Sequence, residues 1–598
     1  MGGRDPVVIV GGGIAGMTAL YENLKHGIPT VLYEKSPQGV GGVVWNKDVG
    51  NKSLDMGGEL IDSSHKSLLA LSKEVGLTPI DTLAAPPSAD QQDYYFDSKT
   101  GKLHSGSDLL TADKNPKKAT GLFLPLAEEI RKDYAQMGKP DPATKDWLKT
   151  DFNKKLDAMS AQDYLDQKYK KLAAEGKPVD PAVKKAIENA YQCENGRDLK
   201  DISALVLVNQ LGQGQTGKGI NFSEDLAIFG KSDERYKIPG GTAALIERLK
   251  EKSEEMARQK GFPPPIQLDR SLTGVDRTPD GKTALNFKAA DGSTSSVKTD
   301  YVISALPAPV LAAVPGAENL GLSHGQTEFM KNLQYTNSSK VFFEVKGTPW
   351  TNFTAKGADG TSKHVTNSDG TFFGDTIKES WITGDGSLTK QGTSWVTCLV
   401  GGNENSKYST PQQLIDATKK EYARILGKNP DDIFKLDGKD LGTAILSNKT
   451  AGGGVGCYAS PGVGQGIASV RLSQQLAHGT SVDGKPVAGF AGSWVTGVDH
   501  STKTPGLEIG FMNVGVESAE KAAAECAKNL KIMNDPKNQA KLAGAQPVAP
   551  PVDHVEQGGI KSSVQPNRDF KKASDNQTTV TTPAPVPDPA APALPRPK

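Results

Sequence analysis

The chain has few cysteines and no long apolar run, and each absence excludes a class of protein. Its 598 residues include only four widely spaced cysteines and no C-x-x-C pair: Cys193, Cys398, Cys457 and Cys526. That spacing argues against a disulfide framework and a cysteine-rich zinc site. No run reaches the roughly 18 apolar residues of a membrane-spanning helix. No secretory leader is visible, so we expect a soluble, cytoplasmic protein without a metal site.

The chain also lacks an excess of either charge. It has 70 Lys and Arg residues against 69 Asp and Glu residues, a formal net charge of +1. This balance gives no support for a nucleic-acid or anionic-membrane partner. Glycine, in contrast, is abundant, with 65 residues. The length predicts several domains, and the glycines predict many turns and close backbone approaches.

A strand, a glycine turn and a helix follow one another at the N-terminus. Val7 to Val10 is a short β-branched run, and Gly11 to Gly16 follows with the spacing G-x-G-x-x-G. A helical pattern extends from Met17 to about His26, and a second apolar run, Thr30 to Tyr33, ends in Glu34. This order of strand, turn, helix, strand and acid is typical of a dinucleotide-binding βαβ unit.

The spacing within this unit has physical reasons. Gly11 makes the tight turn, Gly13 lets a pyrophosphate approach the backbone, and Gly16 lets the helix pack closely on the strand. The pyrophosphate then lies on the positive end of the helix, and Glu34 is placed to accept hydrogen bonds from a ribose hydroxyl. A second glycine pair, Gly41-Gly42, follows the Glu34 strand. An NAD-binding domain has no use for it there, whereas many FAD-binding enzymes run such a pair beside the cofactor's phosphates.

Helical and strand patterns alternate along the rest of the chain. Amphipathic periodicity predicts helices over 66–75, 123–136, 144–158, 160–174, 181–192, 243–257, 411–426 and 513–530. Apolar and β-branched runs predict strands over 266–276, 283–289, 296–298, 300–307, 340–346, 371–374, 379–383, 394–400 and 487–492. From about 540 the sequence is rich in Pro, Ala, Val, Thr and Gln, and we expect a disordered tail over 540–598.

Five blocks occur in a fixed order. They are the glycine turn with Glu34; Gly41-Gly42 with Asp55-Met56-Gly57-Gly58; Pro239-Gly240-Gly241 with Val302 to Pro307; Ser339 to Phe343 with Pro349-Trp350; and Phe490-Ala491-Gly492 with Gly510 to Glu520. Together they resemble the FAD-dependent amine oxidoreductases of the monoamine oxidase type. The resemblance extends over roughly residues 1–530 and is far more specific than any single motif.

The resemblance implies an α/β fold with a Rossmann-like FAD-binding domain of discontinuous segments and an α+β substrate domain. The FAD-binding domain would comprise 1–80, 235–310 and 450–535; the substrate-binding domain would comprise 311–449 and 81–234, the latter with a helical insertion. The chain departs from the family pattern at Val43, where Arg is frequent, and at Ser493-Trp494, where an acidic or Thr-Glu pair is frequent. An insertion at about 495–508 then delays the last block.

The resemblance also implies which residues carry a reaction. Lys340, ten residues before Trp350, would hold a water at flavin N5. Tyr458 and Phe511 would sandwich a substrate amine in front of the flavin, because ring faces favour a nearby cation. The structural alternatives are a surface lysine at the start of a strand and two aromatic residues of the core.

Other residues would hold the cofactor. Some relatives carry the flavin on a cysteine at the place of Cys457, but most bind FAD without a covalent bond, and we expect non-covalent binding; a small buried thiol is the alternative. The backbone of Met512, Asn513 and Val514 would face the flavin edge where negative charge develops. The remaining members of the cofactor-binding set are Gly57, Gly58, Leu272 and Gly492.

Glu59 directly follows the Gly57-Gly58 pair and is a candidate for binding a substrate ammonium. It would equally serve to bond backbone or flavin, as would the nearby Asp62. Leu60 stands about where amino-acid oxidases of this superfamily place an Arg that clamps a carboxylate, which lowers the expectation of an α-amino-acid substrate.

These assignments predict an FAD-dependent oxidase of the C–N bond of an amine. A hydride passes from the α-carbon to flavin N5, the imine hydrolyses, and O₂ is reduced to H₂O₂. The alternatives are an L-amino-acid oxidase or a desaturase on the same fold and, in a different class, a non-catalytic FAD-binding scaffold. The expected partners are a small amine and O₂, with no nucleic acid and no membrane span, and a homodimer is left open.

Overall fold

The computed structural model describes residues 5–49, 52–82, 94–105, 123–138, 150–213, 232–357, 359–366, 368, 370–384, 387–447, 455–495 and 510–534. Two features predicted from the sequence lie outside these residues. They are the insertion beyond Val495 and the tail over 540–598.

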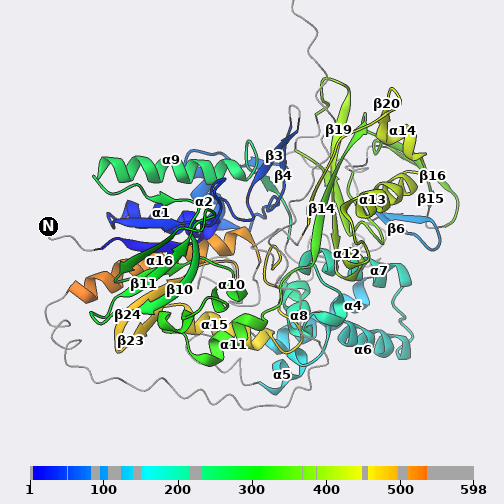
Figure 1. Ribbon diagram of the computed structural model, residues 1–598. Coiled ribbons are helices and arrows are strands. Elements are labelled where there is room, and N and C mark those ends of the chain that lie inside the picture. The colour runs from blue at the N-terminus through cyan, green and yellow to red at the C-terminus, as the bar shows by residue number, and fades with distance from the viewer. Residues whose placement is uncertain are drawn as a thin grey trace, which may run out of the picture. The chain divides into compact units, whose positions relative to one another are not determined.

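A six-stranded sheet is built around the first strand and brings together distant parts of the chain (Figure 1). Its strand order is β23–β24–β13–β1–β2–β9. Neighbours run parallel except for β23, which is antiparallel to β24. The strands are β1 (Val7–Val10), β2 (Thr30–Tyr33), β9 (Ile266–Gln267), β13 (Val302–Ser304), β23 (Thr480–Val482) and β24 (Lys485–Phe490).

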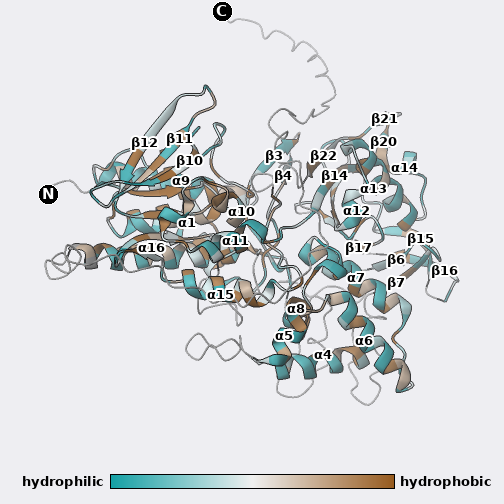
Figure 2. Ribbon diagram, turned by 60° about the horizontal axis from the view of Figure 1, so that its bottom comes forward, coloured by the Kyte–Doolittle hydropathy of each residue, from teal (hydrophilic) through white to brown (hydrophobic). Residues whose placement is uncertain are grey.

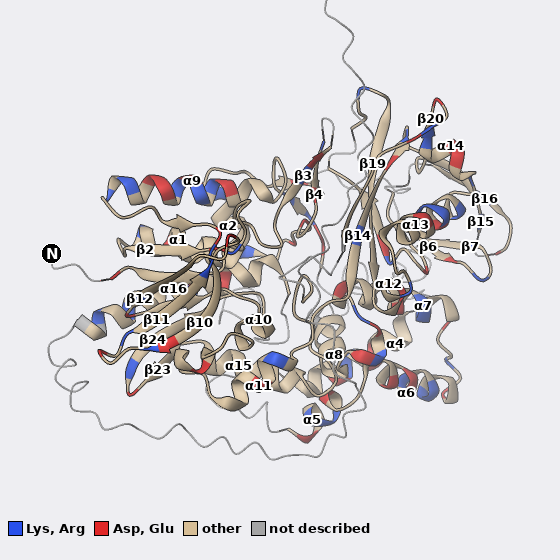
Figure 3. Cartoon of the chain, in the orientation of Figure 1, with Lys and Arg blue, Asp and Glu red and all other residues tan. Residues whose placement is uncertain are grey.

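Both faces of the central strands are covered, as their continuous apolar sequences predict. Val7 and Ile9 of β1 pack among the helices α1 (Ile14–Lys25), α2 (Lys66–Glu74), α9 (Ala243–Gln259) and α16 (Met512–Asn534). Val8 and Val10 point to the other face. They pack towards β10 (Ser271–Arg277), β11 (Thr283–Lys288), β12 (Thr294–Thr299), α10 (Ala308–Ala312) and α11 (His324–Asn332). Helix α9 buries one stripe and carries Lys, Arg and Glu along the rest of its length (Figure 3).

A second sheet has nine strands in the order β16–β15–β7–β6–β17–β18–β19–β14–β22. Along β14 the side chains alternate: Val341, Phe343 and Val345 pack beneath α13 (Pro411–Ile425), whereas Phe342 packs with Leu54. The strands are β6 (Tyr94–Asp97), β7 (Lys102–Ser105), β14 (Ser338–Lys346), β15 (Asn352–Gly357), β16 (Ser362–Thr366), β17 (Phe372–Phe373), β18 (Glu379–Ile382), β19 (Thr393–Gly401) and β22 (Thr443–Ser447).

Five helices pack together around a further apolar cluster. Hydrophobic and hydrophilic residues alternate along their ribbons (Figure 2). They are α4 (Leu124–Met137), α5 (Asp151–Asp157), α6 (Ala161–Ala174), α7 (Pro181–Asn195) and α8 (Ala204–Gln213). The start of α5 is fixed by Thr150, whose side chain accepts a hydrogen bond from the backbone N–H of Asn153. Of the predicted helix over 144–158, residues 144–149 lie outside the described residues, and the rest contains α5.

The helical reading of 81–234 was incomplete, because β6 and β7 lie within it as an antiparallel hairpin. Gly101, with a φ of 68°, lies in the turn between these strands. Helix α8 and strands β15, β16 and β22 were also missed. Helix α8 and strand β22 pack against segments that lie far away in the sequence. In the β15–β16 hairpin, apolar and polar residues alternate only weakly.

The remaining elements are short. They are β3 (Asn46–Val49), β4 (Lys52–Asp55), β5 (Ile80–Asp81), β8 (Tyr236–Lys237), β20 (Lys435–Leu436), β21 (Lys439–Asp440), α12 (Asn403–Ser406), α14 (Pro430–Phe434), α15 (Gly466–Leu476) and two 3₁₀ turns, Leu199–Asp201 and Ala317–Leu320. None of the described helices combines the length and the apolar character needed to cross a membrane.

Candidate active site

A cavity of about 650 Å³ lies at the carboxyl ends of β1, β2 and β13. This is where open parallel sheets bind their ligands. Its lining residues come from three parts of the chain that lie far apart in sequence, within 10–46, 270–335 and 457–515. Nine residues predicted from the sequence are among them: Gly11, Gly13, Glu34, Gly42, Leu272, Cys457, Gly492, Phe511 and Met512.

Four other predicted glycines lie behind the cavity wall and allow its segments to pack. An added Cβ would meet Gly11 O at 1.9 Å from Gly16 and Val44 O at 2.5 Å from Gly41. It would meet Val43 O at 1.6 Å from Gly57, and Met512 Sδ at 2.6 Å from Gly58. Val514 is buried in helix α16, and Lys340, Glu59 and Tyr458 are likewise absent from the lining.

The N-terminus of α1 opens into this cavity. Gly13 is its N-cap, no side chain caps it, and its first turn holds no acidic residue. An added Cβ at Gly13 would come no closer than 3.9 Å to protein, so it would fill cavity space. Free N–H groups at a helix start, beside a cradle kept open by glycine, fit an anionic pyrophosphate.

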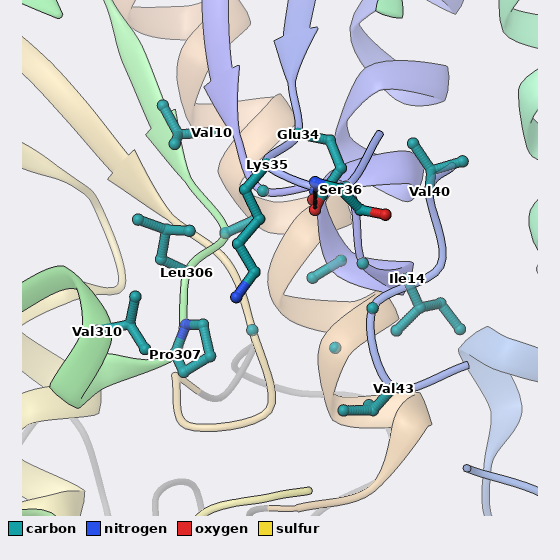
Figure 4. A pocket seen from close by; sticks show the side chains of 18 of the residues that line it. Val10, Ile14, Glu34, Lys35, Ser36, Val40, Val43, Leu306, Pro307 and Val310 are labelled. Carbon is teal, nitrogen blue, oxygen red and sulfur yellow. Dashed lines mark hydrogen bonds between the residues drawn. The ribbon is translucent and has the colours of Figure 1, made fainter. Parts of the chain in front are cut away.

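Glu34 lies beside this turn and holds its backbone through hydrogen bonds. Its Oε2 accepts the backbone N–H of Gly12 at 2.6 Å, and its Oε1 accepts that of Ser36 at 2.9 Å (Figure 4). Each carboxylate oxygen retains a second lone pair. Glu34 therefore organises the loop and still offers acceptors to the cavity that it lines.

Two cationic residues at this end were missed by the sequence analysis. Arg270 and Lys35 both line the cavity, and the Lys35 side chain extends towards Pro307 (Figure 4). Neither belongs to the glycine motif. Lys35 had one positional signal, because it follows the acid that ends β2, whereas Arg270 had none.

Aromatic rings gather at the other end of the cavity. Phe511 packs against His65, with ring centroids 5.3 Å apart. The Tyr458 hydroxyl donates to the carbonyl of Glu194 at 2.9 Å. Gly510 lies against Tyr458, because an added Cβ would meet the Tyr458 ring at 2.6 Å. The sandwich of an amine between Tyr458 and Phe511 stays a prediction.

Cys457 lines the cavity beside Tyr458. Burial raises the pKa of its thiol to about 11, although the charge of Lys340 acts in the opposite direction. The thiol is therefore protonated at neutral pH. A protonated thiol is a weak nucleophile.

Lys340 lies on the face of β14 that meets the loop after β4. Its Nζ donates to the carbonyl oxygens of Asp55 and Gly57 and to Glu59 Oε2, each at 2.9 Å. Burial would raise the pKa of Glu59, but the charges of Lys340 and Lys237 and the hydrogen bonds that it accepts lower it. The structure thus gives Glu59 side-chain partners, whereas the sequence had suggested a substrate ammonium, backbone or flavin.

Asp62 has a structural use. Its Oδ1 accepts the Ser232 hydroxyl at 2.9 Å and the backbone N–H groups of Asp233 at 3.1 Å and Glu234 at 2.8 Å. The backbone N–H of Asp62 in turn donates to His65 Nδ1 at 3.0 Å. Asp62 therefore anchors the segment 232–234 next to the ring pair of His65 and Phe511.

Two more carboxylates, Glu194 and Glu379, lie near Tyr458, and their charges act on its pKa. Burial, then the charges of Asp62 and Glu379, raise the pKa of Glu194 to about 8. Burial raises the pKa of Glu379 to about 7, against the effect of the hydrogen bond that the Cys193 thiol donates at 2.9 Å.

Neither Glu194 nor Glu379 forms an ion pair with a Lys or Arg within the described part of the chain. They differ in this from Glu59, which is held between two lysines. No sequence signal marked either residue. Within the same described residues, no group of three or more His, Cys, Asp or Glu side chains could hold a metal ion.

A family model matches most of the chain, and solved structures share its fold. The sequence model of the flavin containing amine oxidoreductases matches residues 14–525. Wild-type putrescine oxidase bound to putrescine has a TM-score of 0.62 at 17% identity, covering 88% of this chain and 99% of its own. Cyclohexylamine oxidase from Brevibacterium oxydans IH-35A has a TM-score of 0.61 at 16% identity, covering 88% and 100%. No curated protein sequence matches significantly.

Proposed function

Because the chain belongs to the flavin-containing amine oxidoreductases, we propose that it is an FAD-dependent oxidase of amines. One observation carries the proposal. A single cavity is lined by the glycine turn and Glu34 at one end and by Cys457 and Phe511 at the other. This arrangement suits a long dinucleotide whose phosphates and reacting ring lie far apart.

The residues of the cavity would hold FAD in a definite direction. Gly13 and the uncapped start of α1 would receive the pyrophosphate, and Glu34 would receive a ribose. Met512, at the start of α16, would place a second helix N-terminus at the ring end, where it favours negative charge. The FAD-binding segments would be 1–80, 235–310 and 450–535, and the other segments would form the substrate domain.

When bound, FAD supplies a two-electron acceptor, so that an amine becomes an imine that water hydrolyses, while O₂ is reduced to H₂O₂. The chain's own contribution is position and charge. Phe511 lines the cavity, and we expect it and Tyr458 to offer ring faces to a cationic or polarised nitrogen. The protonated thiol of Cys457 agrees with non-covalent FAD, because a thioether at that place needs the thiolate.

The carboxylates near Tyr458 favour a cationic substrate over an amino acid. Glu194 and Glu379 have no compensating cation among the described residues, so an ammonium group would replace the proton that burial makes them retain. A substrate carboxylate would gain no such ion pair from either residue. The proposed substrate is therefore an amine with a second ammonium group, a class that includes the ligand bound to wild-type putrescine oxidase.

The full chain tests this proposal. The purified protein should be yellow, should release FAD on acid precipitation, and should produce H₂O₂ from diamines faster than from monoamines of equal length. It should produce little or none from amino acids or hydrophobic polyenes. A protein that carries FAD but is reduced by none of these compounds would be a non-catalytic scaffold.

A further inference from the structure

A buried ion pair joins two parts of the chain that lie 281 residues apart in sequence. The side chain of Glu59 is 3% exposed, that of Lys340 is 10% exposed, and their charged atoms are 2.9 Å apart. Charges so enclosed are costly unless they are paired and hydrogen-bonded. The pair therefore requires a function or a strict structural need.

Each charged atom of the pair has a partner within the protein. An ammonium has three N–H groups, and Lys340 directs them to Glu59 and to the carbonyl oxygens of Asp55 and Gly57. The other oxygen of Glu59, Oε1, accepts the indole N–H of Trp381 at 3.0 Å and lies 3.8 Å from Lys237 Nζ. Both oxygens of Glu59 thus already have protein partners.

The loop 55–59, which this pair fixes, supports the cavity wall. Gly57 packs so closely on Val43 that a Cβ would lie 1.6 Å from its carbonyl oxygen, and Gly58 packs on the Met512 side chain. Val43 and Met512 both line the cavity. A shift of the loop would therefore move two segments of the wall at once.

The charge of Lys340 reaches the same end of the cavity. It acts on the thiol of Cys457, which lines the cavity next to Tyr458. Glu59 opposes this charge from 2.9 Å away, and Lys237 adds to it from the other side of the carboxylate. Asp55 adds a further nearby carboxylate, whose own oxygen is taken by Thr242.

We propose that Glu59 and Lys340 are coupled positioning residues: they hold the loop 55–59 against the cavity and balance each other's charge at its Cys457 end. The inference rests on the proposed flavin site. It gives Glu59 a role in cofactor placement and potential rather than in substrate binding.

Charge balance makes the test specific. Glu59→Gln adds one positive charge beside the cavity, Lys340→Met removes one, and the double variant leaves the sum unchanged. A bound flavin gains negative charge on reduction, so a more positive surrounding raises its midpoint potential. The potential should shift upwards in the first variant and downwards in the second, and it should return towards the wild-type value in the double variant.

Thermal unfolding of the same full-length proteins supplies the second readout. Glu59→Gln leaves the buried ammonium of Lys340 without its carboxylate, and Lys340→Met leaves Glu59 only the more distant Lys237, whereas the double variant removes both buried charges. The double variant should therefore unfold above at least one single variant. Lys237→Met is the matched control: it removes the same charge, but its side chain is 23% exposed and 3.8 Å from Glu59. It should give a smaller downward shift and little loss of stability, and Glu59→Asp should restore part of what Glu59→Gln loses.

Three results would overturn the proposal. One is a Glu59→Gln variant with unchanged potential and unfolding but a raised KM for amines, which would assign Glu59 to substrate. The second is additive destabilisation in the double variant, and the third is a shift of the potential in the same direction in both single variants. If the wild-type protein binds no flavin, the proposed function fails, whereas the unfolding series still decides whether the pair is coupled.

Discussion

The two ends of the cavity are built in different ways. The Glu34 end comes mainly from one continuous stretch, and its polar contacts run between a carboxylate and backbone N–H groups. The Cys457 end is assembled from segments hundreds of residues apart, and its polar contacts join charged side chains, as Lys340 and Glu59 do. The first end has the shape and the free N–H groups that suit the pyrophosphate of a dinucleotide. For the second end we propose the role of distinguishing substrates.

The largest effect is expected at the assembled end, from Asp62→Ala. This change removes the acceptor of three part-buried donors in the 232–234 segment, at roughly 1–3 kcal/mol for each unsatisfied group. We expect a loss of about 3 kcal/mol in the free energy of unfolding, measured by urea denaturation. Asp62→Asn keeps one acceptor oxygen and should lose clearly less. Equal losses would mean that the anchor is not formed as described.

The next effect tests the local end. Gly13→Ala should weaken FAD binding about tenfold or more, roughly 1.4 kcal/mol, because the Cβ occupies the cradle for the pyrophosphate. Stability of the flavin-free chain should stay unchanged, since the added Cβ has no protein atom closer than 3.9 Å. The measurement is a fluorescence titration with FAD. Gly274→Ala, on β10 and outside the cavity lining, is the control and should bind FAD like the wild type.

A smaller loss is expected from Tyr458→Phe. The change keeps the ring and removes the hydrogen bond to the Glu194 carbonyl, worth about 1 kcal/mol of stability. Turnover of amines should survive, because the ring face is retained. Tyr458→Leu should lose turnover while still binding FAD. Full activity of the leucine variant would remove Tyr458 from the substrate site.

The last effect is a pH dependence caused by Glu194. Its pKa rises from 4.5 to about 8 on folding, so between these values the folded chain keeps a proton that the unfolded chain releases. Its contribution to stability is therefore complete below about pH 4.5 and is lost as the pH rises through about 8. Glu194→Gln cannot lose it in this way. Between about pH 5 and pH 8, the unfolding temperature of the variant should rise relative to that of the wild type. Unfolding temperatures that change in parallel with pH would contradict the raised pKa of Glu194.

The contrast between the two ends also explains what the sequence could predict. Strands β1 and β2, helix α1 and the glycine spacing were readable because their signals lie within one βαβ unit. Side chains alternate along a strand, so the sequence predicts that Lys340 and Phe342 lie on one face of β14. It does not predict which loop packs against that face. Glu59 had a predicted place near the flavin, and its partners Lys340 and Trp381 lie hundreds of residues later.

The charge pattern of the assembled end could not be read at all. Glu194 lies in the last turn of α7, and Glu379 begins a short strand whose backbone pairing does not depend on its side chain. Burial raises both pKa values, helped by the charges of Asp62 and Glu379 at Glu194 and by the charge of Glu59 at Glu379. Such effects appear only when the segments meet. They are also the features that bear most on the choice of substrate.

The most direct test of the central claim is an anaerobic titration of the yellow, full-length protein with amines, followed through the visible absorbance of its flavin. A short aliphatic diamine should bleach this absorbance at lower concentration than a monoamine of the same length, and admission of O₂ should restore the colour and yield H₂O₂. If dithionite bleaches the flavin but neither diamine nor monoamine does so, the protein is not an amine oxidase.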